Sequence, residues 1–181
     1  KAREMVTAFL KANAAQRGKL WVRINPIQGP FALADVAAVM AGAPAGIMLP
    51  KPRGRADADL LDHYLTALEA VFGIEVGSTK VIVLATEEPA SLLEIGSYKG
   101  TPRRVAMPGG AEELATALGA SDNRGDYGGY DYTYELARSL CLIGASAAGV
   151  AAIETIHGDF RDDDGLRKRA SAMRRAGWRG M

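Results

Sequence analysis

The sequence predicts an α/β fold in which parallel strands alternate with amphipathic helices. Short apolar runs alternate with longer stretches whose apolar residues recur at helical spacing. The short runs are apolar on both faces, as strands of a covered parallel sheet are. They recur every roughly 25 to 45 residues, which fits a series of right-handed strand–helix–strand units. With 181 residues, of which 48% are hydrophobic, the chain can bury one sizeable core.

Five runs are expected to be strands, because each is short, mostly apolar and bounded by turn-forming residues. The sequences "LWVRIN", "AGIMLPK", "KVIVLAT", "RRVAMPGG" and "AGVAAIET" carry them, at residues 20–25, 45–51, 80–86, 103–110 and 148–155.

Helical patterns lie between these strands. The stretch at 57–73 places its apolar residues on one stripe and ends at Gly73, a residue that suits a helix C-terminus. The stretch at 110–120 begins with two acids, which suit the positive end of a helix. The same reasoning predicts helices at 1–16, 30–42, 89–100, 134–149 and 162–178, with a long surface loop at 121–135.

The strand period is close to that of a (β/α)₈ barrel, which needs about 200 residues or more. Only five complete units fit, so the residues alone leave two possibilities: an incomplete barrel or an open doubly wound sheet. The chain has no G-x-G-x-x-G or phosphate-loop pattern, which weighs against nucleotide binding. It opens inside a helical pattern, and "GWRGM" at 177–181 stops as a strand is about to begin. We therefore expect a piece of a longer chain, forming part of a single barrel domain over 1–181.

Charge and composition give no support to several classes of partner. Lys plus Arg number 22 and Asp plus Glu 21, so charge alone predicts neither a nucleic-acid nor a membrane partner. The single cysteine, Cys141, excludes an internal disulfide and fits a reducing, cytoplasmic compartment. No apolar run reaches the roughly 18 residues of a membrane span.

Charged and polar residues gather where the strands end, the edge at which α/β proteins place their sites. Several carboxylates together repel one another unless a cation lies among them, and Mg²⁺ prefers such oxygen ligands. The residues delivered to this edge are Arg23, Asn25, Pro50, Lys51, Thr86, Glu87, Glu88, Gly109, Gly110, Glu112, Glu113, Glu154 and Thr155.

Each of these residues also has a structural interpretation. Glu112 and Glu113 can serve only the dipole of the helix that they begin, and Glu88 before Pro89 can be a first-turn helix acid. Arg23 lies between apolar neighbours, so its charge needs a partner, which a structural salt bridge would also provide. Lys51 can be solvent-exposed.

Several blocks of the sequence resemble the citrate lyase β-subunit-like proteins of the HpcH/HpaI aldolase superfamily. These blocks are "WVRINP", "GIMLPK", "ATEEPASLLEIGSYKG", "GGAEELATALGA", "ELARSLCLIGASAAGVAAIET" and "DFRDDDGLRKRA", in family order over nearly the whole chain. The resemblance is to acyl-CoA lyases of the malyl-CoA and citramalyl-CoA type. It implies a (β/α)₈ barrel that cleaves or forms a carbon–carbon bond with Mg²⁺ or Mn²⁺, and a coenzyme A thioester as substrate.

The resemblance also implies roles for individual residues. Arg23 matches the catalytic arginine that binds the 2-oxo acid and stabilises negative charge on its oxygen. Glu87 matches the first metal ligand, and Glu113 falls where the family usually has an aspartate as the second. The backbone at Gly110 and Ala111 matches the turn that receives the substrate carboxylate.

The sequence departs from the family pattern at several points. Glu113 is one methylene longer than aspartate, Glu88 replaces a common threonine, and Glu154 replaces a usual aspartate. The family's first two strands, which include basic residues that help to hold CoA, and its last strand with a C-terminal lid have no counterpart here. The general acid or base is therefore expected in those segments or in a neighbouring subunit. The family tends toward trimers and hexamers, so a homo-oligomer is expected.

These observations favour an Mg²⁺-dependent lyase that splits a β-hydroxyacyl-CoA into an acetyl-CoA-type thioester and a 2-oxo acid or glyoxylate. Two alternatives stay open. One is a divergent accessory barrel whose altered carboxylates no longer hold Mg²⁺. The other is a metal-dependent aldolase that acts on free 2-oxo acids without CoA.

Overall fold

The computed structural model describes residues 1–125 and 129–181, and its centre is one parallel β-sheet. The strands pair in the order β1-β2-β3-β4-β5, so that each strand lies beside the one that precedes it in the chain. Their bounds are β1 (Trp21–Arg23), β2 (Gly46–Leu49), β3 (Lys80–Val83), β4 (Arg104–Pro108) and β5 (Ala151–Ile153).

This strand order decides between the two architectures that the residues left open. A doubly wound sheet reverses its strand order at a switch point, whereas a barrel adds strands in sequence. The sequential order therefore matches five consecutive strands of a (β/α)₈ barrel and excludes the open doubly wound alternative. All five strands fall inside the predicted runs but are shorter, because the ends of the runs turn away from the sheet to form the loops.

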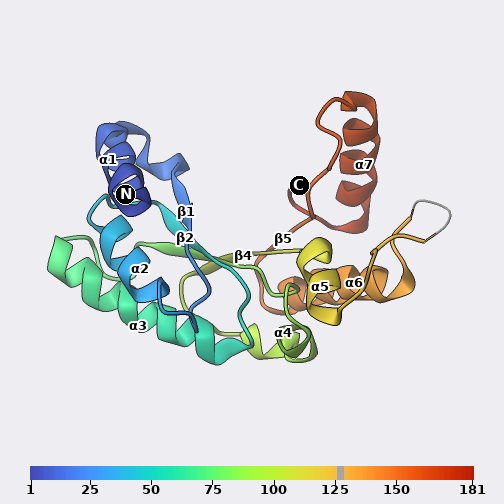
Figure 1. Cartoon of the computed structure of the whole chain (residues 1–181), viewed down its shortest axis with the longest axis horizontal. Coiled ribbons are helices and arrows are strands. Elements are labelled where there is room, and N and C mark those ends of the chain that lie inside the picture. Colours follow the sequence, from blue (N-terminus) through green and yellow to red (C-terminus); the bar gives the residue numbers. More distant parts are fainter. Residues whose placement is uncertain (126–128) are drawn as a thin grey trace.

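Helices follow the outer side of the curved sheet in chain order, with α1 and α7 at its two ends (Figure 1). Of the seven α-helices in the described residues, five fall within the predicted stretches, and α3 and α6 each begin two residues earlier than predicted. The bounds are α1 (Ala2–Ala12), α2 (Ala32–Met40), α3 (Arg55–Phe72), α4 (Pro89–Leu93), α5 (Ala111–Leu118), α6 (Tyr132–Ala147) and α7 (Asp163–Ala176), with 3₁₀ segments η1 (Ala14–Lys19) and η2 (Ile95–Tyr98).

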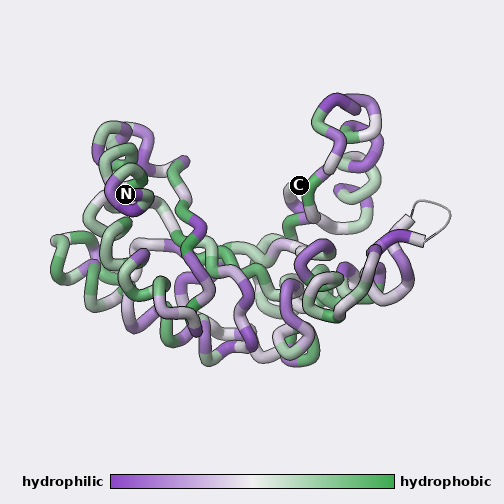
Figure 2. Tube along the Cα trace, viewed as in Figure 1, coloured by the Kyte–Doolittle hydropathy of each residue, from purple (hydrophilic) through white to green (hydrophobic). Residues whose placement is uncertain are grey.

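The two faces of the sheet differ in burial. Ile47 of β2 pairs with Val81 of β3, and both are buried among the helices. Met48 and its partner Ile82 point to the opposite face and are only half-buried. Figure 2 shows hydrophobic residues along the central strands and a largely hydrophilic α7. The main core therefore lies between the sheet and its outer helices.

The helix predicted at 89–100 is interrupted, which corrects the expectation of one short helix. It ends at Leu93, and the chain continues as the tighter η2. This turn brings Tyr98 back over Ser91, whose hydroxyl lies 2.7 Å from the Tyr98 hydroxyl and donates to the Ala85 carbonyl at 2.7 Å. Burial raises the pKa of Tyr98 to about 12, so the phenol stays protonated. The pair fixes the segment that follows β3.

The end of the chain begins to form a further strand beside β5, as the sequence indicated. The Arg179 amide donates to the Ala152 carbonyl, and the Glu154 amide donates to the Gly180 carbonyl, each at 2.9 Å. Ile153 and Gly180 are parallel partners. Trp178 is buried just before this contact and anchors it to the core.

The predicted loop at 121–135 is shorter than expected because α6 already begins at Tyr132. Arg124 and Tyr130 form an antiparallel bridge within it, and positions 126–128 lie outside the described residues. Across the described part of the chain, no helix combines the length and the apolar character needed to cross a membrane.

Candidate active site at the carboxyl ends of the strands

A cavity of about 320 Å³ opens at the carboxyl ends of the strands. Its lining combines apolar side chains with one arginine and four carboxylates. Its lining includes Arg23, Met48, Leu84, Glu87, Pro108, Gly109, Gly110, Glu112, Glu113, Ile153, Glu154 and Thr155. Most of the strand-end residues that the sequence singled out therefore line one cavity. Those outside its lining are Asn25, Pro50, Lys51, Thr86 and Glu88.

Glu87 is the most constrained acid of this cavity. It is almost fully buried just beyond β3, and its two oxygens face different partners. The Lys51 amide donates to Oε2 at 2.6 Å, while Arg23 Nη2 donates to Oε1 at 3.1 Å. Lys51 delivers this amide from a left-handed backbone conformation with φ of 46°, which is uncommon for a residue other than glycine. Glu87 is thus oriented by the ends of β1 and β2.

The electrostatics of Glu87 favour a nearby cation. Burial raises the pKa of its carboxyl group, and the charge of Glu113 acts in the same direction. The Lys51 hydrogen bond and the charge of Arg23 oppose this rise but do not cancel it. A cation between the two carboxylates would favour the ionised form and lower that pKa.

Arg23 connects the two predicted metal ligands. It is the last residue of β1, and its half-exposed guanidinium lies 3.9 Å from Glu113 Oε1 as well as 3.1 Å from Glu87 Oε1. Glu113 comes from the first turn of α5, which follows β4. Three residues that are far apart in the chain, and that the sequence assigned to one site, are therefore brought together.

Gly110 and Ala111 form the turn into α5. A Cβ atom on Gly110 would lie 2.9 Å from Glu87 Cγ, so only glycine allows the turn to pack this closely. Among the described residues no side chain caps α5, whose N-terminus opens at the cavity. The Gly110 amide itself donates to Thr86 Oγ1 at 2.7 Å, so the anion-binding part of the turn begins at Ala111.

The donor set fits Mg²⁺, although it is small. Within residues 1–125 and 129–181, no group of three or more His, Cys, Asp or Glu side chains comes together in a metal-binding arrangement. Mg²⁺ in enzymes is commonly held by one or two carboxylates, with water and substrate oxygens completing the octahedron. Glu87 and Glu113 supply two carboxylates, which lie 3.1 Å and 3.9 Å from the Arg23 guanidinium, and this agrees with that number.

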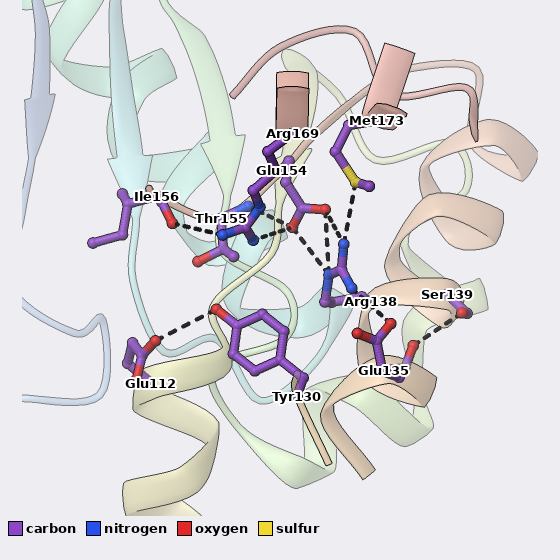
Figure 3. Close-up of polar contacts among 10 residues, drawn as sticks. All are labelled: Glu112, Tyr130, Glu135, Arg138, Ser139, Glu154, Thr155, Ile156, Arg169 and Met173. Carbon is purple, nitrogen blue, oxygen red and sulfur yellow. Dashed lines mark hydrogen bonds and ion pairs between the residues drawn. The ribbon is translucent and has the colours of Figure 1, made fainter. Parts of the chain in front are cut away.

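Glu154 lines the same cavity but is engaged elsewhere (Figure 3). Arg138 Nη2 donates to its Oε2 at 2.5 Å, and Arg138 Nε lies 3.2 Å from both oxygens. Arg169 of α7 approaches to 3.7 Å, and the Thr155 amide donates at 2.8 Å. Glu154 therefore lies at the strand ends with the other acids, as expected, but its charge is already balanced by this ion pair with α6.

Other strand-end residues serve local structure. Asn25 donates through its side chain to Asp35 Oδ2 at 2.6 Å, an interaction that the sequence did not indicate. Glu112 is exposed and accepts from Asn123 Nδ2 at 2.5 Å. Glu88 is half-buried and is the N-cap residue of α4, one position before the first turn in which it was expected as a helix acid, and its side chain makes no capping hydrogen bond among the described residues.

The sequence singled out the strand-end residues themselves but not the residues that form hydrogen bonds or ion pairs with them. Arg138, Asp35 and the acceptor role of Thr86 each became visible only in the folded chain. A signal for Arg138 did exist, since a carboxylate such as Glu154 at the end of a buried strand needs a cationic partner. The sequence does not indicate which arginine fills that role.

A family model of aldolases and citrate lyases matches the whole chain. Residues 1–181 match the HpcH/HpaI aldolase/citrate lyase family, and the chain belongs to it. Citrate lyase subunit beta of Haemophilus influenzae is 28% identical over 160 residues, which cover 88% of this chain and 53% of that protein. L-malyl-CoA/beta-methylmalyl-CoA lyase of Rhodobacter capsulatus is 29% identical over 175 residues, covering 87% of this chain and 53% of the lyase. The chain spans about half the length of these curated relatives.

Solved structures agree with the barrel assignment. The citrate lyase beta subunit from M. tuberculosis, complexed with oxaloacetate and magnesium, is 28% identical and superposes with a TM-score of 0.73. That match covers 92% of this chain and 70% of the other. A citrate lyase from Burkholderia xenovorans LB400 superposes with a TM-score of 0.84 at 21% identity, over 98% of this chain and 58% of the other, which shows the shared fold.

Proposed function

We propose that this chain forms part of an Mg²⁺-dependent carbon–carbon lyase. Its substrate would be a β-hydroxyacyl-CoA such as malyl-CoA or citramalyl-CoA, and its products an acetyl-CoA-type thioester and a 2-oxo acid or glyoxylate. The observation that carries the proposal is the placement of Arg23 between the carboxylates of Glu87 and Glu113 at the carboxyl edge of the sheet. The related structure with oxaloacetate and magnesium adds support from outside the chain.

Three charged residues of the cavity, Arg23, Glu87 and Glu113, would have roles in this reaction. When bound, Mg²⁺ supplies a Lewis acid for the oxygens of the oxo acid. Glu87 and Glu113 would hold the ion, and the buried position of Glu87 makes its carboxylate dependent on nearby positive charge. The Arg23 guanidinium would donate hydrogen bonds to the hydroxyl-derived oxygen of the oxo-acid part, which is negatively charged after its proton leaves and becomes a carbonyl oxygen as the carbon–carbon bond breaks.

The N-terminus of α5 would hold the substrate carboxylate. The first amides of a helix point out of its N-terminus and carry partial positive charge. In α5 these amides begin at Ala111, one residue beyond the turn that packs on Glu87. A carboxylate there would place the adjacent oxo group toward Arg23 and the metal ligands. The apolar part of the lining, which includes Met48 and Ile153, would limit the access of water to the reacting groups.

The decisive experiment combines Mg²⁺ calorimetry with turnover assays in the full-length protein. We expect Mg²⁺ binding and cleavage of malyl-CoA or citramalyl-CoA by the wild-type protein, and loss of both in Glu87→Gln with folding intact by circular dichroism. Arg23→Ala is expected to lose turnover. Glu75→Gln provides a matched control, because Glu75 is exposed and precedes β3 at the other end of the sheet.

The outcomes separate the three functions. Full turnover in Glu87→Gln or Arg23→Ala contradicts the proposed lyase. Cleavage of free hydroxy-oxo acids without CoA identifies the aldolase instead. Absence of Mg²⁺ binding by the wild-type protein, with or without oxo acid, identifies the accessory barrel.

A further inference from the structure

We propose that Thr86 is a positioning residue that ties the glycine turn before α5 to the end of β3 and so sets the spacing of Glu87 and Glu113. The inference rests on the proposed function, in which these two carboxylates hold Mg²⁺. It adds a residue that contacts neither metal nor substrate and acts through the turn.

The contact itself is buried and well formed. Thr86 is 2% exposed, and its Oγ1 accepts a hydrogen bond of 2.7 Å from the Gly110 amide. The register of β3 with β4 runs to Ile82 and Ala106, so this bond joins the two segments beyond their backbone pairing. A buried amide that loses its acceptor is unfavourable, and the turn would move to regain one.

The turn cannot move without moving the proposed metal ligands. Gly110 packs directly on Glu87, since an added Cβ would lie 2.9 Å from Glu87 Cγ and 3.7 Å from Glu113 Oε2. Glu113 follows three residues later on the first turn of α5. Because Thr86 immediately precedes Glu87, the hydrogen bond links the backbones that carry the two acids.

A purely structural threonine would affect stability alone, and three variants of the full chain separate the two roles. Thr86→Val removes the acceptor at nearly constant volume, whereas Thr86→Ser keeps it. Thr101→Val is the matched control: Thr101 is also buried, lies before the opposite end of β4, and its hydroxyl has no hydrogen-bond partner among the described residues.

The measurements are Mg²⁺ affinity by calorimetry and exchange of the Gly110 amide by NMR. We expect Thr86→Val to lower Mg²⁺ affinity by about 10- to 100-fold, the range seen for residues that orient metal ligands. Its Gly110 amide should exchange faster. Thr86→Ser and Thr101→Val should keep the wild-type affinity and a slowly exchanging amide.

Wild-type Mg²⁺ affinity in a folded Thr86→Val protein overturns the inference. If Thr86→Val does not fold, the wild-type protein and Thr86→Ser test the inference. Rapid exchange of the Gly110 amide in the wild-type protein overturns the inference, and so does a tenfold weaker Mg²⁺ affinity in Thr86→Ser. Absence of Mg²⁺ binding by the wild-type protein overturns the proposed function and the metal-positioning role together. Gly110 exchange then still shows whether Thr86 holds the turn.

Discussion

Glu113 is the residue at which the side-chain length of this site differs from the family pattern. Its side chain is about one-third exposed and reaches to within 3.9 Å of Arg23. We expect Glu113→Gln to lower Mg²⁺ affinity by about tenfold or more, since a ligand contributes at least as much as the residues that orient it. Calorimetry measures the affinity, and the melting temperature should stay unchanged because the side chain is not part of the core.

The neighbouring acid offers the control. Glu112 lies on the same helical turn, is exposed and is bonded to Asn123. Glu112→Gln removes the same charge one residue away and should leave Mg²⁺ affinity close to that of the wild-type protein. An equal loss in both variants would show that the cavity attracts Mg²⁺ through overall charge rather than through Glu113.

At the scale of elements, a buried ion pair fixes α3 to the start of β4. Glu69 of α3 is fully buried and accepts from Arg103 Nη1, the Thr79 amide and the Gly77 amide, each at 2.8 Å. Arg103 also pairs with Asp62. Burial by itself would raise the pKa of Glu69, but these hydrogen bonds outweigh it and lower the pKa to about 2.

The lowered pKa of Glu69 predicts that the protein loses part of its free energy of unfolding in acid. A carboxyl group whose pKa is lower in the folded state contributes stability above its unfolded pKa of 4.5, and the contribution disappears as the pH falls toward 2. The contribution is on the order of 3 kcal/mol. Urea unfolding from pH 7 to pH 2 should therefore show Glu69→Gln less stable than wild type at pH 7 and the difference shrinking below pH 4.5.

The exposed Glu4 of α1 provides the reference for that experiment. Glu4→Gln should follow the wild-type curve at every pH. A constant difference between wild type and Glu69→Gln down to pH 2 would contradict the linkage, because the carboxylate would then not be the group that titrates.

At the scale of the molecule, stability is unequal between the centre of the sheet and its last helix. α7, which is described over its whole length, contributes no buried residue, whereas Val81 and Val83 of β3 lie in the core. Amides with few buried neighbours open most readily. Native-state hydrogen exchange should show the amides of α7 exchanging well before those of β3, and equal protection of the two would contradict this ranking.

The sequence predicted the strands well because their apolar character on both faces is a local property. The strand order was not predictable in the same way, since pairing depends on contacts between residues far apart in the chain. Arg23 and Glu87 stood out as charges beside apolar residues, and the fold brings them together, although their roles toward metal and substrate stay predictions. Thr86 was expected at the same edge, but its hydrogen bond with the Gly110 amide was not predictable, because the two residues are 24 positions apart.

The order β1-β2-β3-β4-β5 has a consequence for how the protein is made. A ribosome releases the chain from its N-terminus, and every strand from β2 onward emerges to find its neighbour already synthesised. Each pairing closes over only the helices that connect two consecutive strands and does not wait for a distant partner. The sheet can therefore form during translation by adding one strand at a time. Each new strand pairs with the free edge of the strand that precedes it in the chain.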